Sequence, residues 1–354
     1  MKVEKWDYLH TGIYIDELAR SGLAGPSSSI TVGMAFGVPP LIKFGSPALQ
    51  AEFLPSFLTG AKRCCIAITE PSAGSDVANI STTATKSPDG KSYTVSGSKK
   101  WITNGIWSDY ATMAVRTGPP DSGAAGLSLL LVPLLNTPGV SMRRLKPSGQ
   151  VTGGTTYIEL DNVRVPASNL IGLEGQGMRY IMTNFNHERL TIAVLVTRQA
   201  RVALSAALEY TMKREAFGAP LIEQPVVRNR LARAGAELES MWAWVEAFLY
   251  QMAHLSPSEA DVKLGGLTAL AKAKAGLVIN ECAQCAVLLF GGNGYTTTGQ
   301  GELVEKIYRE VMGFRIPGGS EDVMLDLAVR LLVKNYRVGL KKLGKGEEGQ
   351  KAKL

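Results

Sequence analysis

Cysteine and histidine are scarce in this 354-residue sequence, which contains four cysteines and three histidines. Two cysteines, Cys282 and Cys285, form a C-x-x-C pair, but no second pair stands at the spacing of a zinc site. The pair also lies inside the mostly apolar run Leu277–Leu289, and the histidines are scattered along the chain. We therefore expect buried, reduced thiols, no bound metal and no metal-based mechanism.

Long hydrophobic runs are also lacking. No segment reaches the roughly 18 consecutive apolar residues that a membrane-spanning helix needs. Residues 1–5 are largely charged and open no apolar stretch of the signal-peptide type. Hydrophobic residues nevertheless make up 45% of the chain, which is enough for a large core. We expect a soluble, non-secreted protein with more than one domain and no membrane span.

Acidic residues are outnumbered by basic ones, and the formal net charge is +7. Seven basic and only two acidic residues fall between positions 334 and 354, so most of the excess belongs to a Gly- and Lys-rich tail. The rest of the chain is nearly balanced. Because a basic tail of this kind is usually just solvated, we expect no nucleic-acid partner.

The residue pattern changes along the chain and predicts an α+β protein. Residues 1–64 have helical spacing and predict an N-terminal helical domain, whereas residues 65–173 contain short β-prone runs and predict a middle antiparallel β-barrel or sandwich. Within these runs Ser87-Pro88-Asp89-Gly90 predicts a hairpin, because Pro fixes one turn dihedral and Gly supplies a positive φ. Residues 174–336 return to a helical period, and residues 337–354 form the basic tail.

The C-terminal region predicts long helices joined by short loops, which is typical of an antiparallel four-helix bundle. One helix start is clear in Ser256-Pro257-Ser258-Glu259, where Ser caps, Pro takes the first turn and Glu follows three residues after the cap. The predicted helices are Met178–Lys213, Val226–Leu255, Pro257–Phe290, Glu302–Met312 and Glu321–Asn335.

Four motifs occur in order along this layout. The stretch Ala67–Asp76 reads A-I-T-E-P-S-A-G-S-D, and Gly97–Gly105 contains K-K-W-I-T-N-G. Later come Arg214–Gly218, R-E-A-F-G, and Phe290–Tyr295, F-G-G-N-G-Y. Together they resemble the acyl-CoA dehydrogenase family from about residue 10 to residue 335. The resemblance implies that family's fold, with a front end shorter than in typical members, so that some leading helices are absent.

The resemblance implies FAD as the cofactor. On that basis Thr69 and Thr103 contact the flavin edge, Trp101 covers one of its faces, and Ser75 meets the pyrophosphate or the CoA arm. The glycines of the F-G-G-N-G-Y loop would let backbone N–H groups approach the pyrophosphate; a helical run precedes them, so this is no Rossmann fingerprint. The remaining expected cofactor contacts are Ile68, Arg214, Phe217, Gln224, Gly291, Gly292, Ser320 and Asp322.

Arg214 and Phe217 match family positions that reach the FAD of a neighbouring subunit. The resemblance therefore implies a homo-oligomer, commonly a homotetramer built as a dimer of dimers. Two positions beside these motifs depart from the family pattern. Pro225 stands where a Gln usually follows R-x-x-F-G, with Gln224 one residue early, and Leu288 replaces a Gln that often precedes the glycine loop.

The expected substrate is an acyl-CoA. Arg189 matches an arginine that meets CoA in the family, and Asn186, Ser75 and Gly319 are further expected substrate contacts. Dehydrogenation also needs a hydrogen-bond donor to the thioester oxygen, where negative charge develops. The backbone N–H of Gly318 is the candidate donor.

The usual catalytic base is missing. In many relatives it is the Glu of a Y-E-G-T turn, and Gly318 stands at that position here. Branches resembling the long-chain and isovaleryl-CoA dehydrogenases take the base from an adjacent helix instead. Counting back from Gly291 places Glu259 near that alternative site, where burial would raise its pKa. Glu259 is therefore our predicted base, although it also completes a capping box with Ser256; Asp261 and Glu239 are the substitutes.

The resemblance implies oxidation of the α,β C–C bond of an acyl-CoA to trans-2-enoyl-CoA, in fatty-acid β-oxidation or in secondary-metabolite processing. Two other functions stay open: a flavin-dependent monooxygenase or nitroalkane-type oxidase, and a non-catalytic flavin-binding scaffold. The chain ends Ala352-Lys353-Leu354, a variant of the S-K-L peroxisomal signal. We expect a peroxisomal location, with mitochondrial or cytoplasmic location as alternatives, and either O₂ or an electron-transfer flavoprotein as electron acceptor.

Overall fold

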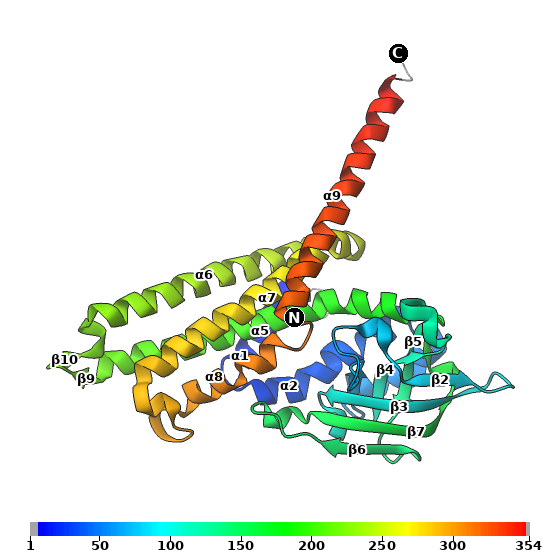
Figure 1. Cartoon of the computed structure of the whole chain (residues 1–354), viewed down its shortest axis with the longest axis horizontal. Coiled ribbons are helices and arrows are strands. Elements are labelled where there is room, and N and C mark those ends of the chain that lie inside the picture. The colour runs from blue at the N-terminus through cyan, green and yellow to red at the C-terminus, as the bar shows by residue number, and fades with distance from the viewer. Residues whose placement is uncertain (1–5, 352–354) are drawn as a thin grey trace. The chain divides into compact units, whose positions relative to one another are not determined.

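The computed structural model describes the backbone of residues 6–351 and their side chains, apart from those of Pro26, Met34 and residues 341–351. The chain forms two compact units, and Figure 1 labels most of their elements. The sheet unit is Leu23–Glu188, and the helical unit combines Met1–Gly22 with Arg189–Leu354. We expected divisions at residues 64 and 173 from secondary-structure content, whereas packing joins most of the leading helices to the sheet.

The sheet unit is built on one eight-stranded sheet with the order β6-β7-β3-β2-β4-β5-β8, in which β1 also pairs with β4. Most neighbours are antiparallel, as expected, but β4 runs parallel to both β1 and β2. The strands are β1 Cys64–Ala67, β2 Thr83–Lys86, β3 Ser92–Ile102, β4 Tyr110–Arg116, β5 Leu127–Pro133, β6 Val140–Arg144, β7 Thr156–Pro166 and β8 Leu170–Ile171.

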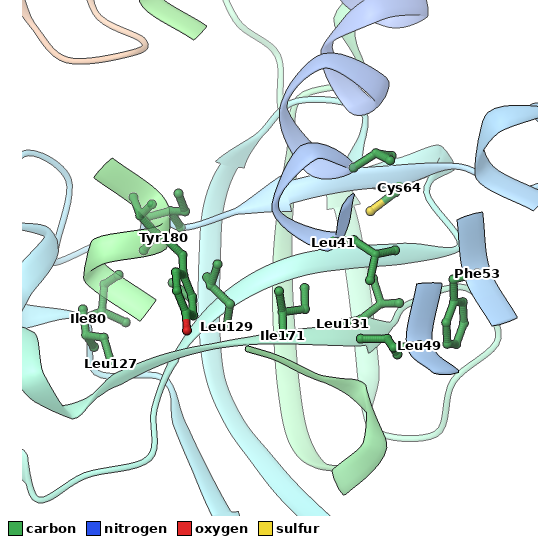
Figure 2. Close-up of a cluster of buried hydrophobic side chains, with 14 of the residues drawn as sticks. Leu41, Leu49, Phe53, Cys64, Ile80, Leu127, Leu129, Leu131, Ile171 and Tyr180 are labelled. Carbon is green, nitrogen blue, oxygen red and sulfur yellow. The ribbon is translucent and has the colours of Figure 1, made fainter. Parts of the chain in front are cut away.

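Strand β5 shows how the sheet separates two cores. Side chains alternate along a strand, so Leu127, Leu129 and Leu131 enter one buried cluster while Leu130 and Val132 enter another. The first cluster also takes Leu41, Leu49 and Phe53 from the leading helices, and Figure 2 shows Leu41 and Leu49 beside Leu131. The helices of this unit are α2 Ala24–Val32, the π-helix Gly33–Gly37, α3 Pro39–Phe44 and α4 Pro47–Leu58.

The predicted hairpin at Ser87–Gly90 is confirmed. Strands β2 and β3 are antiparallel neighbours on either side of it. Gly90 has a φ of 69°, and its N–H donates to the Ser87 carbonyl at 2.9 Å. The positive φ is the reason why glycine follows aspartate in this turn.

The helical unit contains α1 Tyr8–Ala19, most of α5 Gly177–Lys213, α6 Pro225–His254, α7 Pro257–Phe290, α8 Glu302–Arg315 and α9 Glu321–Lys351. A short hairpin, β9 Glu215–Ala216 and β10 Ala219–Pro220, joins α5 to α6. Helix α7 is buried along much of its length by small side chains such as Ala269, Ala273 and Ala283. All four cysteines are buried free thiols, as expected.

The predicted C-terminal helices are confirmed to within three residues at every end but one. We expected the last helix to end at Asn335, and this is wrong, because α9 continues to Lys351. Its added residues include many Lys, Leu, Glu and Gln, which favour helix, with glycines spaced singly among them. Helices α5 and α7 are long and apolar enough to cross a membrane by length and composition, but about half of each apolar stretch is buried within the chain.

Candidate active site

Two segments expected at the flavin edge are joined in the sheet unit. The backbone N–H of Lys100 donates to the Thr69 carbonyl at 3.0 Å, which ties the loop after β1 to the end of β3. Trp101 follows at a break in the β3–β7 register and has a φ of 61°. A bulky residue with positive φ is strained, and such strain concentrates at functional sites. The residue is 53% exposed, so its indole is available to cover a flat ligand.

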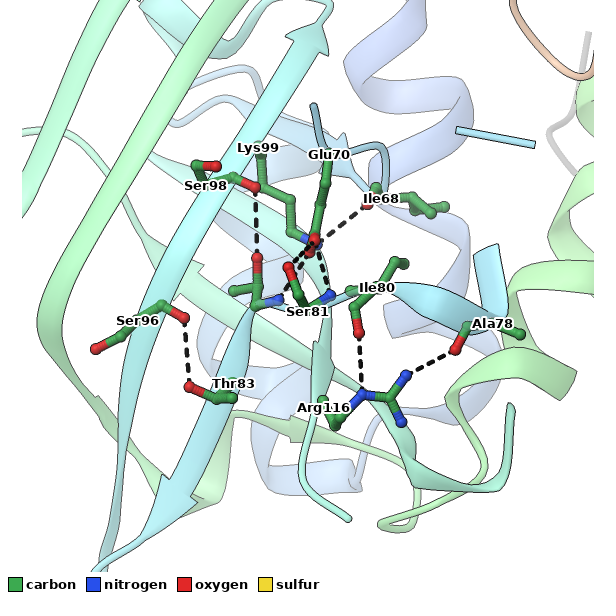
Figure 3. A network of polar contacts seen from close by, with 11 residues as sticks. Ile68, Glu70, Ala78, Ile80, Ser81, Thr83, Ser96, Ser98, Lys99 and Arg116 are labelled. Carbon is green, nitrogen blue, oxygen red and sulfur yellow. Dashed lines mark hydrogen bonds and ion pairs between the residues drawn. The ribbon is translucent and has the colours of Figure 1, made fainter. Parts of the chain in front are cut away.

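A buried ion pair fastens the same two segments. The Lys99 ammonium of β3 lies 2.8 Å from the Glu70 carboxylate and 3.1 Å from the Ile68 carbonyl (Figure 3). The Oε2 atom of Glu70 accepts from the N–H and the hydroxyl of Ser81 at 2.7 and 2.8 Å. The Oε1 atom, which faces Lys99, also accepts from the N–H of Thr82 at 3.0 Å. Both side chains of the pair are almost fully buried. The loop is therefore held through Glu70, directly beside Thr69.

Burial and pairing act in opposite directions on this ion pair. Burial alone would raise the pKa of Glu70, but the charge of Lys99 and the hydrogen bonds from Ser81 and Thr82 outweigh it and lower that pKa. Burial also lowers the pKa of Lys99, and the charge of Glu70 opposes that shift. The pair is ionised at neutral pH and holds its geometry there.

The other expected contacts in the sheet unit differ in exposure. Ile68 is buried and presents its backbone, whereas Thr69 and Thr103 are half-buried. Ser75 is exposed on the loop after β1. Asn104, next to Thr103, has a left-handed backbone and is bonded through its own N–H to the Gly153 carbonyl at 2.9 Å. The unit thus offers two hydroxyls near one exposed indole.

The helical unit carries the glycine loop at the end of α7. Gly291 has a φ of 59°, and a Cβ added at Gly291 or Gly292 would meet nothing within 4 Å. These glycines border a hollow of about 410 Å³, whose wall includes a stacked Tyr210–Phe290 pair. Arg214 also borders it and supplies a positive charge. Open backbone beside an arginine fits an anionic group such as the FAD pyrophosphate.

The hairpin between α5 and α6 projects an aromatic ring. Phe217 has a φ of 57° and is 93% exposed. The ring is therefore accessible to a second molecule. Gln224 caps the start of α6 through its backbone and is half-buried.

The loop between α8 and α9 holds the candidate thioester donor. Gly318 and Gly319 have φ values of 70° and 102°, a conformation that L side chains rarely adopt. In the described part of the chain the Gly318 N–H donates to no protein acceptor. A Cβ on Gly318 would lie 2.8 Å from Cδ1 of Ile192 on α5, so this loop packs against that helix. Ser320 is half-buried and Asp322 is exposed.

The structure contradicts the environment that we expected for Glu259. Its side chain is 52% exposed, and its carboxylate accepts from the Ser256 hydroxyl at 2.7 Å in a complete capping box. These bonds to Ser256, with the nearby Lys263, lower its pKa, so the raised pKa that we expected is wrong. A solvated capping carboxylate already has its hydrogen bonds and lacks the burial that would make it a stronger base.

A different carboxylate has the burial that a base needs. Glu188 lies on α5 and is only 8% exposed, between the half-buried His187 and Arg189, which is 3% exposed. We did not predict Glu188 from the sequence. The signal was available, because Ile181 and Ile192 stand seven residues before and four residues after it, on the apolar face of a helix. Asn186 is half-buried on the same helix.

Three family models match the chain. They describe the N-terminal, middle and C-terminal domains of acyl-CoA dehydrogenases and match residues 4–61, 65–163 and 175–332. Acyl-CoA dehydrogenase apdG of Emericella nidulans is 71% identical over 345 residues, which are 98% of this chain and 78% of that protein.

Solved structures of acyl-CoA dehydrogenases have the same fold as this chain. The acyl-CoA dehydrogenase of Geobacillus kaustophilus is 31% identical, with a TM-score of 0.83 over 92% of this chain and 83% of that one. The butyryl-CoA dehydrogenase of Megasphaera elsdenii is 28% identical, with a TM-score of 0.85 over 92% of this chain and 82% of that one. The proteins of this group are FAD-binding flavoproteins and oxidoreductases. The chain belongs to the acyl-CoA dehydrogenase family.

Proposed function

We propose that this protein oxidises the α,β C–C bond of an acyl-CoA to give trans-2-enoyl-CoA, in fatty-acid β-oxidation or in the processing of a secondary-metabolite acyl chain. The observation that carries the proposal is the buried carboxylate of Glu188 on α5. It supplies the base that the loop of Gly318 lacks.

Helix geometry supports this role for Glu188. Residues four apart on a helix share a face, so Glu188 emerges from the face of α5 whose next turn carries Ile192. Ile192 borders the Gly318 position. A base on this face and an N–H donor on the neighbouring loop are the two groups that removal of an α-proton from a thioester requires.

The chain's own residues then divide the work. Glu188 takes the α-proton, and the Gly318 N–H donates to the thioester oxygen as charge develops there. Arg189 adds a positive charge beside the base for the CoA phosphates, and Thr69, Thr103 and Trp101 hold and cover the flavin. Bound FAD would supply the acceptor for the hydride that leaves the β-carbon. The substrate thus loses one proton and one hydride.

We also propose a homo-oligomer, with the dimer of dimers as its form. The exposed side chains of Phe217 and Arg214 on one short segment support it, because a second subunit would cover the ring and use the charge. The identity of the electron acceptor, O₂ or an electron-transfer flavoprotein, is tested by comparing the turnover rate with each.

The tripeptide Ala352-Lys353-Leu354 lies outside the described residues, and peroxisomal targeting stays a prediction.

Anaerobic mixing of the purified yellow protein with acyl-CoAs of different chain length tests the function. Loss of the flavin absorbance on addition of a thioester is the expected result. Glu188→Gln should keep FAD bound and slow bleaching by roughly 10²- to 10⁴-fold, the usual contribution of a general base. Glu259→Gln is the matched control, and it should bleach at the wild-type rate.

Each other outcome has a defined meaning. A wild-type protein that stays yellow with every acyl-CoA would contradict the proposed reaction and favour the oxygenase or scaffold alternatives. Fast bleaching in Glu188→Gln, with slow bleaching in Glu259→Gln, would return the base to Glu259.

A further inference from the structure

A buried lysine of α7 supports the loop that carries Gly318. Lys272 is 1% exposed. Its ammonium donates to the Arg315 carbonyl at 2.7 Å and to the Gly319 carbonyl at 2.6 Å. These two acceptors lie on either side of Gly318 in the sequence. We infer that Lys272 is a positioning residue that fixes the direction of the Gly318 N–H toward the thioester oxygen.

The loop needs such support because of its composition. Two consecutive glycines in the left-handed region have many alternative conformations, and nothing in their own side chains selects one. Hydrogen bonds from a charged donor are short and roughly twice as strong as neutral ones, so the Lys272 bonds can select one. The Lys272 Cε lies 3.9 Å from the position of a Gly318 Cβ, directly against the residue in question.

A second set of contacts closes the ends of the loop without reaching its middle. The Arg315 side chain forms a two-fold ion pair with Glu321, with Nε 3.0 Å from the carboxylate. The Met324 N–H donates to the Ser320 carbonyl at 2.9 Å. These contacts fix where α8 ends and α9 begins. Only Lys272, among the loop contacts described, bonds to one of the two glycines, at Gly319.

This inference rests on the proposed function, in which the Gly318 N–H meets the thioester oxygen. If the N–H is displaced by a few tenths of an ångström, its hydrogen bond to that oxygen weakens. The loss of binding energy is greatest in the transition state, where the oxygen carries the most charge. Loss of the Lys272 bonds should therefore lower kcat and leave KM nearly unchanged. A lysine with a merely structural role would lower stability and leave both constants alone.

The test compares Lys272→Met with Ile279→Ala in the FAD-loaded enzyme. Ile279 is fully buried on the same helix, seven residues after Lys272, and its apolar side chain cannot donate a hydrogen bond to the loop. Lys272→Met should lower kcat by roughly 10- to 100-fold, below the loss for complete removal of an oxyanion donor, with KM within about threefold. Ile279→Ala should lower the melting temperature and keep kcat.

A spectroscopic measurement reads the hydrogen bond itself. Acetyl-CoA labelled with ¹³C at its thioester carbonyl has no β-carbon and cannot be dehydrogenated, so it reports binding without turnover. Its carbonyl stretch, followed by difference infrared spectroscopy, should move to lower frequency on binding to the wild type. In Lys272→Met a large part of this shift should be lost. If that variant does not fold, Lys272→Gln, which keeps a shorter donor, takes its place with a smaller expected loss.

An unchanged kcat together with an unchanged carbonyl shift in the lysine variant would overturn the inference. So would an equal loss of kcat in Ile279→Ala. Failure of the proposed function looks different, because the wild-type flavin would then not bleach with any acyl-CoA.

Discussion

The two buried lysines of this protein do different work in the two units. Lys99 in the sheet unit bonds to the side chain of Glu70, and that carboxylate in turn gathers the loop after β1. Lys272 in the helical unit bonds to backbone carbonyls on both sides of Gly318. The first lysine fastens two chain segments to each other, and the second selects one conformation of one loop. The difference teaches that one buried charge can stabilise the fold while another orients a single hydrogen-bond donor, here the Gly318 N–H.

Removal of the Lys99 charge should give the largest loss of stability. Lys99→Met leaves Glu70 buried without its cation, and breaking such a pair typically costs about 3–5 kcal/mol. The free energy of unfolding in urea measures it. The double variant Lys99→Met with Glu70→Gln should recover a large part, because no lone charge remains. FAD affinity should fall in Lys99→Met, and a normal affinity would contradict the comparison with Lys272, whose variant should change kcat instead.

An alanine at the supported loop should have an intermediate effect. Gly318→Ala forces a side chain into a left-handed backbone and against Ile192, and we expect a loss of about 2 kcal/mol in unfolding free energy. Gly60→Ala is the matched control, because Gly60 has a similar φ of 75° and nothing lies within 4 Å of its Cβ position. Thermal denaturation of both variants separates backbone strain from the contact. Equal losses would mean that the packing against Ile192 is unimportant.

As the pH falls, protonation of His187 should destabilise the protein at a higher pH than protonation of Glu70. Burial, assisted by the charge of Lys43, lowers the pKa of His187 to about 4. In the unfolded chain the pKa of this histidine is the ordinary 6.5. The contribution of the neutral His187 to the free energy of unfolding is therefore full above pH 6.5 and is lost as the pH falls toward 4. We expect a loss of about 1–2 kcal/mol, reduced from the full shift by partial exposure.

The His187→Gln variant should remove most of this pH dependence, and His254→Gln, at an exposed histidine of α6, should retain it. Glu70 affects stability at lower pH. Because its pKa is lowered, the stability that the pair contributes is lost only as the pH falls below the ordinary carboxyl range. A loss between pH 6.5 and 4 that persists in His187→Gln would assign it to another group and weaken the separation of the two windows.

Much of the fold followed from periodicity and turn chemistry. The start of α7 could be predicted from Ser256 and Glu259, and the β2–β3 hairpin from Asp89-Gly90, because caps and turns depend on neighbouring residues alone. The end of α9 could not, since propensity is weak where glycines are mixed with good helix formers. The parallel pairing of β1 with β4 depends on contacts distant in sequence, which local patterns do not contain.

The candidate site was predicted unevenly for the same reason. Motifs led us to Thr69, Trp101 and the glycine loops as site residues, and these roles stay predictions. Among them Trp101, Gly291, Gly318 and Gly319 have positive φ values. The base was different, because counting along the chain from Gly291 led to Glu259, a solvated cap. Burial decides whether a carboxylate can act as a base, and burial depends on which face of α5 the residue occupies. The spacing of Glu188 from Ile181 and Ile192 indicates that face, and our count from Gly291 did not use it.

The position of Glu188 also has a consequence for protein engineering. A carboxylate borne by a long helix moves only as the helix moves, whereas the loop of Gly318 is short and rich in glycine. Residues around that loop could therefore be exchanged to admit longer or branched acyl chains without displacing the proton acceptor. Moving the acid back to position 318 would be harder, since any side chain there must adopt a left-handed backbone and displace Ile192.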